Sequence, residues 1–146
     1  MINLHEPSVG KDEKKALIEC VNKGNIAIGD YINLFESKIR NKLNAKHSLS
    51  IINCSAALSL AVKLVSDGNK NEIIVPAISF VSPINAIVQN NCDPIFMDVD
   101  RSLCLDVEKT IEFLEKHTYQ KKDFKSKKNY TYNKKNNKKI IALIVV

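Results

Sequence analysis

Apolar residues recur along the chain at two spacings, and these spacings predict alternating helices and strands. Over residues 11–23 and 30–44 the apolar positions lie three or four residues apart, which predicts two amphipathic helices, each half buried. Gly24 stands where a glycine commonly follows a helix, and Asp30 is a good cap for the second helix. The beginning of the chain is therefore expected to be helical.

Short apolar runs predict the strands, and helical spacing returns between them. The predicted strands are residues 48–52, 72–75, 94–99 and 140–146. The helices predicted between them begin near Ala56, at Ser82 and after a cap at Asp106. Strands that alternate with helices predict an α/β fold with three layers, in which helices cover both faces of a parallel sheet.

The last seven residues, IIALIVV, are apolar throughout and predict a strand buried on both faces. Such a strand needs covering helices, so we expect the chain to be a fragment that is cut off in this strand. The expected organisation is an N-terminal domain part over residues 1–118, a basic loop or hairpin over residues 119–139, and the next strand of the sheet over residues 140–146.

Positive charge is concentrated in residues 119–139, which hold nine lysines and one aspartate, a balance of 9 − 1 = +8 in a chain of net charge +6. Aromatic residues lie between these lysines, a composition typical of surfaces that bind phosphates or single-stranded nucleic acid. A solvated hairpin is the alternative interpretation. Lysine and asparagine are common along the whole chain, which weighs against nucleic acid as the partner. The aromatic residues are Tyr119, Phe124, Tyr130 and Tyr132.

Several classes of protein do not fit the sequence. The first residues have no apolar core of a signal peptide, and no run reaches the roughly 18 apolar residues of a membrane helix. We therefore expect a cytoplasmic protein that does not enter a membrane. The four cysteines form no CxxC pair and have no ligand spacing with the three histidines, which predicts reduced thiols and no metal site.

The stretch from Ser48 to Leu64 holds a strand, turn and helix pattern that can bind an anion. Ser55 is predicted to cap the helix, whose first N–H groups and positive dipole end attract a phosphate or carboxylate. An ordinary capped connection between a strand and a helix explains the same pattern. Cys54 is interpreted as a small filler, since no base can be placed beside it. Asp98 and Asp100 are expected to serve the turn after their strand.

Five pieces of the chain occur in the order found in one enzyme family. They are HEPSVGKDEKK, GDYINLFE, NCSAAL, EIIVPAISFVSPINAI and PIFMDVD. Together they resemble the DegT-type family of sugar aminotransferases, which depend on pyridoxal 5′-phosphate (PLP), and the resemblance covers nearly the whole chain. It implies the N-terminal half of the large domain of a fold-type I aminotransferase.

The resemblance also implies roles for particular residues. Ser55 matches the residue that binds the PLP phosphate, Ala56 supplies a neighbouring backbone N–H, and Phe80 matches the aromatic residue that lies against the pyridine ring. Considered without the family, Phe80 is more typical of a core residue. Asn25, Ile26 and Ala27 match a loop near the sugar substrate.

The implied reaction moves an amino group from glutamate to a keto sugar on a nucleotide carrier, in the biosynthesis of surface polysaccharides or nonulosonic acids. The family works as a homodimer. Its Schiff-base lysine comes after the strand at which this sequence ends, so no catalytic residue is assigned. The chain alone is expected to be inactive and to bind PLP weakly or not at all. The alternative is a small binding domain that holds a phosphate, a nucleotide or nucleic acid through its lysine-rich segment.

Overall fold

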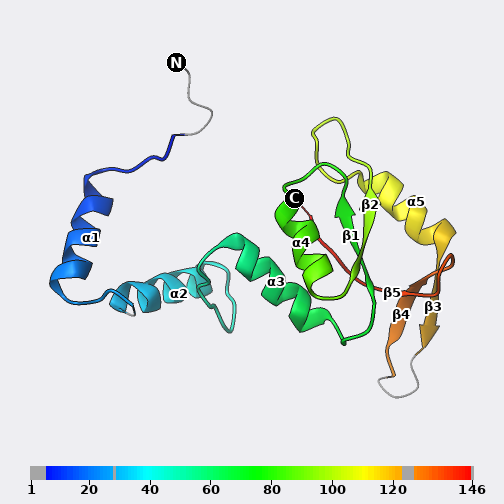
Figure 1. Cartoon of the computed structure of the whole chain (residues 1–146), viewed down its shortest axis with the longest axis horizontal. Coiled ribbons are helices and arrows are strands. Elements are labelled where there is room, and N and C mark those ends of the chain that lie inside the picture. Colours follow the sequence, from blue (N-terminus) through cyan, green and yellow to red (C-terminus); the bar gives the residue numbers. More distant parts are fainter. Residues whose placement is uncertain (1–5, 28, 123–126, 146) are drawn as a thin grey trace. The chain divides into compact units, whose positions relative to one another are not determined.

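The computed structural model describes residues 6–27, 29–122 and 127–145 (Figure 1). The chain divides into two compact units, residues 1–50 and residues 51–146, which are considered separately. None of the helices in the described ranges is long and apolar enough to cross a membrane. The organisation expected from the sequence, with divisions at residues 118 and 139, stays a prediction, and Phe124 lies outside the described residues.

The first unit contains the two predicted helices, α1 (Lys11–Asn22) and α2 (Asp30–Lys42). The chain leaves α1 through Gly24, whose φ of 71° is the left-handed conformation that a glycine adopts easily. The N-cap of α2 is Gly29, so Asp30 is the first residue of the helix and not its cap. As the first residue, the Asp30 carboxylate still lies at the positive end of the helix dipole.

The expected half burial of these two helices is wrong, because neither buries a residue. Leu17, Val21 and Phe35 are 65%, 66% and 56% exposed. Polar contacts join the parts of this unit instead: the Tyr31 hydroxyl donates to Glu19 at 3.1 Å. The apolar stripes that the sequence predicts are thus present, and the described residues of this unit do not cover them.

The strand predicted over residues 48–52 is also wrong, because these residues pair with no strand of the described sheet. The N–H and the hydroxyl of Ser50 both donate to Glu36, at 2.8 and 3.0 Å. Ile52 is 91% exposed. An apolar run becomes a strand only where a neighbouring strand offers its backbone groups.

The second unit is a five-stranded sheet with the order β2-β1-β5-β4-β3. Strands β1 (Glu72–Pro76), β2 (Asp93–Met97) and β5 (Lys139–Leu143) run parallel. Strands β3 (Thr118–Lys122) and β4 (Asn129–Asn133) form an antiparallel hairpin, and β4 pairs antiparallel with β5. The α/β fold is confirmed, with a sheet that is mixed because the lysine-rich segment joins it.

Helices cover both faces of this sheet, as predicted. Ile73 and Val75 of β1 pack with α3 (Cys54–Val65) and α4 (Val81–Gln89) on one face. Ile74 points to the other face, where it packs with Met97 and with residues of α5 (Val107–His117). The cap predicted for α5 is confirmed, since the Asp106 carboxylate accepts from the Lys109 N–H at 3.0 Å.

Strand β5 lies in the middle of the sheet but is only half buried, contrary to the expectation of burial on both faces. Ile141 and Ile144 pack against the layer of α3 and α4, and Ile140 packs toward α5. Leu143 and Val145 remain 40% and 70% exposed. They are exposed because neither layer of described helices reaches them.

Three carboxylates hold the turn between β4 and β5 against the amino ends of the parallel strands. Glu72, the first residue of β1, is 5% exposed and accepts from the side-chain amides of Asn133 and Asn136 at 2.9 and 2.6 Å. Asp93, the first residue of β2, pairs with Lys138. Asp67 pairs with Lys139 at 2.6 Å. These contacts are called the amino-end clamp below.

The clamp also shifts the titration of its charged members. The Lys139 ammonium and the Asn71 amide hold the pKa of the Asp67 carboxyl well below its usual range. The same ion pair raises the pKa of Lys139, and Lys138 lowers the pKa of Asp93. Asp67, Asp93 and Lys139 are therefore charged at neutral pH.

We predict that Glu72→Ala lowers the free energy of unfolding by about 1–3 kcal/mol, because it leaves the amides of Asn133 and Asn136 without their acceptor. Urea unfolding followed by circular dichroism measures the change. The control is Glu112→Ala, which removes an exposed pair with Lys116 and should cost less than about 0.5 kcal/mol. Equal losses in the two variants would contradict the structural role of Glu72.

Candidate functional site

The first turn of α3 is capped by Asn53, and not by Ser55 as the sequence predicted. The Asn53 side-chain oxygen accepts from the Ala56 N–H at 2.8 Å, and its carbonyl accepts from Ala57 at 3.1 Å. Asparagine is among the best N-cap residues, and its side chain reaches the third residue of the helix. The Ala56 N–H that was expected to face an anion is thus already engaged within the turn.

Two other backbone donors of this turn remain directed outward. Within the described part of the chain, the N–H groups of Cys54 and Ser55 have no acceptor. They are the first two residues of α3, where the helix dipole is positive. The anion-binding capacity of the turn is therefore shifted toward Cys54 and Ser55.

The Ser55 side chain contacts a second serine, Ser82, in the first turn of α4. Its hydroxyl lies 3.0 Å from the hydroxyl of Ser82 and forms a hydrogen bond with it. Ser55 is the second residue of α3, and Ser82 is the second residue of α4. The hydrogen bond therefore joins the first turns of two neighbouring helices.

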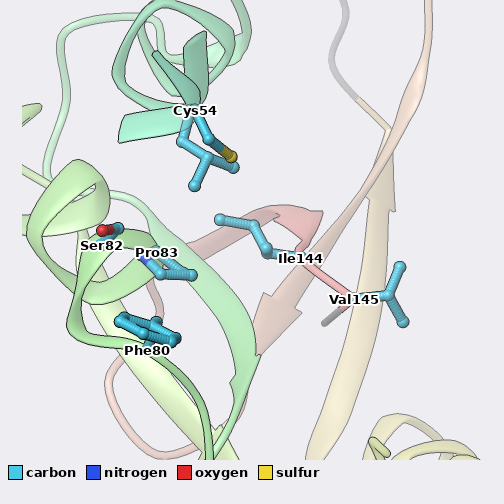
Figure 2. Close-up of a pocket in the computed structure, with 7 residues that line it drawn as sticks. Cys54, Phe80, Ser82, Pro83, Ile144 and Val145 are labelled. Atoms are coloured by element: carbon cyan, nitrogen blue, oxygen red, sulfur yellow. The ribbon is translucent and has the colours of Figure 1, made fainter. Parts of the chain in front are cut away.

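Phe80 lies at the N-cap of α4, in the loop that follows β1, and is 83% exposed. This exposure excludes the interpretation of Phe80 as a core residue. The ring borders a hollow of about 390 Å³, which Figure 2 shows between the start of α3, the start of α4 and the residues after β5. The labelled lining residues are Cys54, Phe80, Ser82, Pro83, Ile144 and Val145.

The hollow lies at the carboxyl edge of the parallel strands. Phe80 follows the end of β1, and Ile144 follows β5 and donates its N–H to the Ile74 carbonyl at 2.9 Å. In open α/β sheets this edge is where ligands bind. No charged residue is among those described as lining the hollow, so its walls suit an apolar ring.

The three predicted substrate residues lie in the first unit and border a different hollow. Asn25, Ile26 and Ala27 line a depression of about 170 Å³ together with Gly29 and Tyr31. A Cβ atom added at Gly29 would lie 2.7 Å from the Cβ of Asn25, so this approach requires a glycine.

Asp98 and Asp100 follow the end of β2. Asp98 accepts from the Val99 N–H at 2.9 Å and Asp100 from the Ser102 N–H at 2.8 Å, which confirms that both serve the turn. Among the residues that the structure describes, no group of three His, Cys, Asp or Glu side chains could hold a metal ion.

Ser82 and Ile144 are residues of the hollow that the sequence analysis did not single out. Ser82 carried a signal, because a serine in the first turn of a helix that follows a buried strand faces the carboxyl edge of the sheet. Ile144 carried none, since its place depends on the pairing of β5 with β1.

A three-layer α/β fold with a helix N-terminus and an aromatic ring at the carboxyl edge is that of the large domain of fold-type I PLP enzymes, and solved structures of this class superpose on the chain. Comparison with protein families gives the particular assignment. A family profile, the DegT/DnrJ/EryC1/StrS aminotransferase family, matches residues 7–123. The chain belongs to this family.

Individual relatives agree with the assignment. GDP-perosamine synthase of Vibrio cholerae is 33% identical over 120 residues, which are 81% of this chain and 33% of the relative. The structure of Helicobacter pylori PseC, an aminotransferase involved in the biosynthesis of pseudoaminic acid, superposes with a TM-score of 0.64 at 30% identity, over 69% of this chain and 28% of PseC.

A third relative has a bound cofactor in its structure. The E. coli GDP-4-keto-6-deoxy-D-mannose-3-dehydratase with bound hydrated PLP superposes with a TM-score of 0.68 at 25% identity, over 77% of this chain and 31% of the dehydratase. The chain thus spans about a third, or less, of the length of these relatives.

We predict that Asn53→Ala lowers the free energy of unfolding by about 1 kcal/mol, because the substitution removes the side-chain cap of α3. Thermal and urea unfolding measure the loss. Asn85→Ala is the matched control, since Asn85 is an exposed asparagine within α4, and it should change stability by less than about 0.5 kcal/mol. A neutral Asn53→Ala would show that the cap contributes nothing to the turn.

Proposed function

We propose that this chain is the N-terminal part of a PLP-dependent aminotransferase that acts on a nucleotide-linked keto sugar, in the biosynthesis of surface polysaccharides or nonulosonic acids. The observation that supports this most directly is the hollow in which the start of α3 and the Phe80 ring meet at the carboxyl edge of the sheet. The family and the names of the relatives from Vibrio cholerae and Helicobacter pylori support the class of substrate.

The volume and the walls of the hollow support PLP as its ligand. Its volume of about 390 Å³ and its uncharged walls suit a substituted pyridine ring. We assign the phosphate to the hydroxyl of Ser55 and to the N–H groups at the start of α3, and the face of the ring to Phe80. Ala56 stays a predicted phosphate contact, which requires its N–H to be shared with Asn53. When bound, PLP supplies the electron sink for amino transfer.

The described residues of the hollow bind and orient, and we propose no covalent role for them. No lysine is among the residues described as lining it. Lys138 and Lys139 belong to the amino-end clamp, at the opposite end of β1. A strand of this length separates its two ends by about 15 Å. Pro83 and Ile144 contribute apolar surface to the walls of the hollow, which limits the access of water.

We predict that the chain binds PLP without a covalent bond and that Phe80→Ala weakens binding about five- to tenfold, the equivalent of about 1 kcal/mol of ring contact. The change in PLP absorbance on titration measures the affinity, and borohydride reduction followed by mass spectrometry detects covalent adducts. Phe96→Ala is the control, because Phe96 is 54% exposed on β2 and is not among the residues that line the hollow.

Two results would contradict this assignment. Equal weakening by Phe80→Ala and Phe96→Ala would remove the hollow as the cofactor site. A reduced adduct at one defined lysine would overturn the statement that this chain binds the cofactor without a covalent bond.

Asn25, Ile26 and Ala27 are proposed as part of the surface for the nucleotide sugar, because they match the substrate loop of the family and border a hollow. We predict that Asn25→Ala weakens binding of a GDP- or UDP-linked sugar about fivefold, through the loss of one amide hydrogen bond. Saturation-transfer NMR measures the affinity. Asn33→Ala, an exposed change on α2, is the control, and an equal effect of both would argue against this loop.

Glutamate as amino donor and a homodimer belong to the same proposal. The alternative role of the lysine-rich segment in binding phosphates, nucleotides or nucleic acid stays a prediction. Its expected strength is reduced by the clamp, because Lys138 and Lys139 are already paired with Asp93 and Asp67. Salt-dependent binding of a polyanion by the wild-type chain, lost when Lys121 and Lys122 are replaced by serine, is the result that would favour it.

A further inference from the structure

The hydrogen bond between Ser55 and Ser82 has a consequence for the phosphate site that follows from counting protons. Two hydroxyl groups carry two protons, and their mutual hydrogen bond at 3.0 Å uses one of them. Whichever serine donates, the other proton stays available. The pair therefore offers one hydroxyl donor to a ligand, and the hydrogen bond between the two serines holds their oxygen atoms side by side.

Ser82 has two features that direct it toward the same ligand as Ser55. It is among the residues that line the hollow, on the side opposite Ile144 in Figure 2. Helix α4 also begins without a side-chain cap, whereas the Asn53 side chain engages the Ala56 N–H of α3. Pro83 contributes no N–H at the next position.

We propose that Ser82 is a second binding residue for the phosphate of PLP: its hydrogen bond orients the Ser55 hydroxyl, and the pair presents its one free proton to the phosphate beside the first turn of α4. This rests on the proposed function. The first turns of α3 and α4 then both direct positive dipole ends toward the phosphate. No carboxylate is among the described residues of the hollow to oppose a phosphate.

The proposal is tested by comparing the affinity of the full chain for PLP with its affinity for pyridoxal, which has no phosphate. In Ser82→Ala we expect the preference for PLP over pyridoxal to fall about tenfold, the value of a hydrogen bond to a charged group, while pyridoxal affinity stays unchanged. In Ser55→Ala with Ser82→Ala together the preference should fall by less than the product of the single effects, because the two hydroxyls act through one shared bond.

The controls separate binding from folding. Ser82→Thr keeps the hydroxyl, and Ser82→Val has nearly the same shape as the threonine variant without a hydroxyl, so only the valine variant should lose the preference. Ser66→Ala makes the same chemical change as Ser82→Ala at the other end of α3 and should keep it. Circular dichroism shows whether each variant is folded.

The outcomes distinguish this inference from the function on which it rests. A wild-type chain without any preference for PLP over pyridoxal would overturn both. A preference that survives Ser82→Ala, or that falls equally in the threonine and valine variants, would overturn the role of Ser82 alone. Equal loss of PLP and pyridoxal affinity in Ser82→Ala would show a purely structural effect and would also overturn it.

Discussion

Burial of β1 on both faces is the constraint on which the second unit depends. Ile73, Ile74 and Val75 are between 0% and 1% exposed, although they point to alternate faces of the sheet. A strand with three such residues in a row needs a helical layer on each side and a neighbouring strand at each edge. The helices α3 and α4, the helix α5, and the strands β2 and β5 meet these needs. Polar side chains can therefore lie only at the two ends of β1.

The two ends of β1 differ in charge: charged side chains lie at the amino end and an uncharged hollow lies at the carboxyl end. At its amino end, buried Glu72 and its neighbours Asp67 and Asp93 hold the turn after β4 through amides and lysines. At its carboxyl end the chain opens into the hollow beside Phe80, which has uncharged walls and the Ser82 hydroxyl, to which the Ser55 hydroxyl is bonded. The separation keeps the paired lysines away from the hollow. The donors near the hollow are therefore backbone N–H groups and hydroxyls. Such donors can bind a phosphate without neutralising its charge.

The sequence predicted those features that depend on nearby residues or on strong burial. The ends of α1, the cap of α5 and the strand β1 follow from local signals such as Gly24, Asp106 and the run Ile73 to Val75. The N-cap of α3 was harder to predict, because the sequence offers two candidates. Asn53 and Ser55 are both good caps, and only the geometry of the turn shows that Asn53 reaches the Ala56 N–H.

Features that depend on distant partners could not be predicted in the same way. The run from Ser48 to Ile52 has the composition of a strand, but the Ser50 groups bond to Glu36 because no strand lies beside them. The half burial of β5 depends on which helices reach it. The hydrogen bond of Ser82 with Ser55 could not be predicted, because the two residues are 27 apart in the sequence.

The lysine-rich segment shows how composition alone overstates an electrostatic surface. Its balance of nine lysines and one aspartate suggests one continuous basic patch. In the fold, Lys138 and Lys139 face acidic partners from the amino ends of the strands, and the Lys139 ammonium also lies 4.3 Å from the centre of the Tyr130 ring. Tyr130 of β4 thus contacts a lysine of the neighbouring strand β5. Some of the lysines and tyrosines that predict polyanion binding therefore attach β4 and its turn to the sheet. A structural role in the sheet is the simpler explanation for these residues.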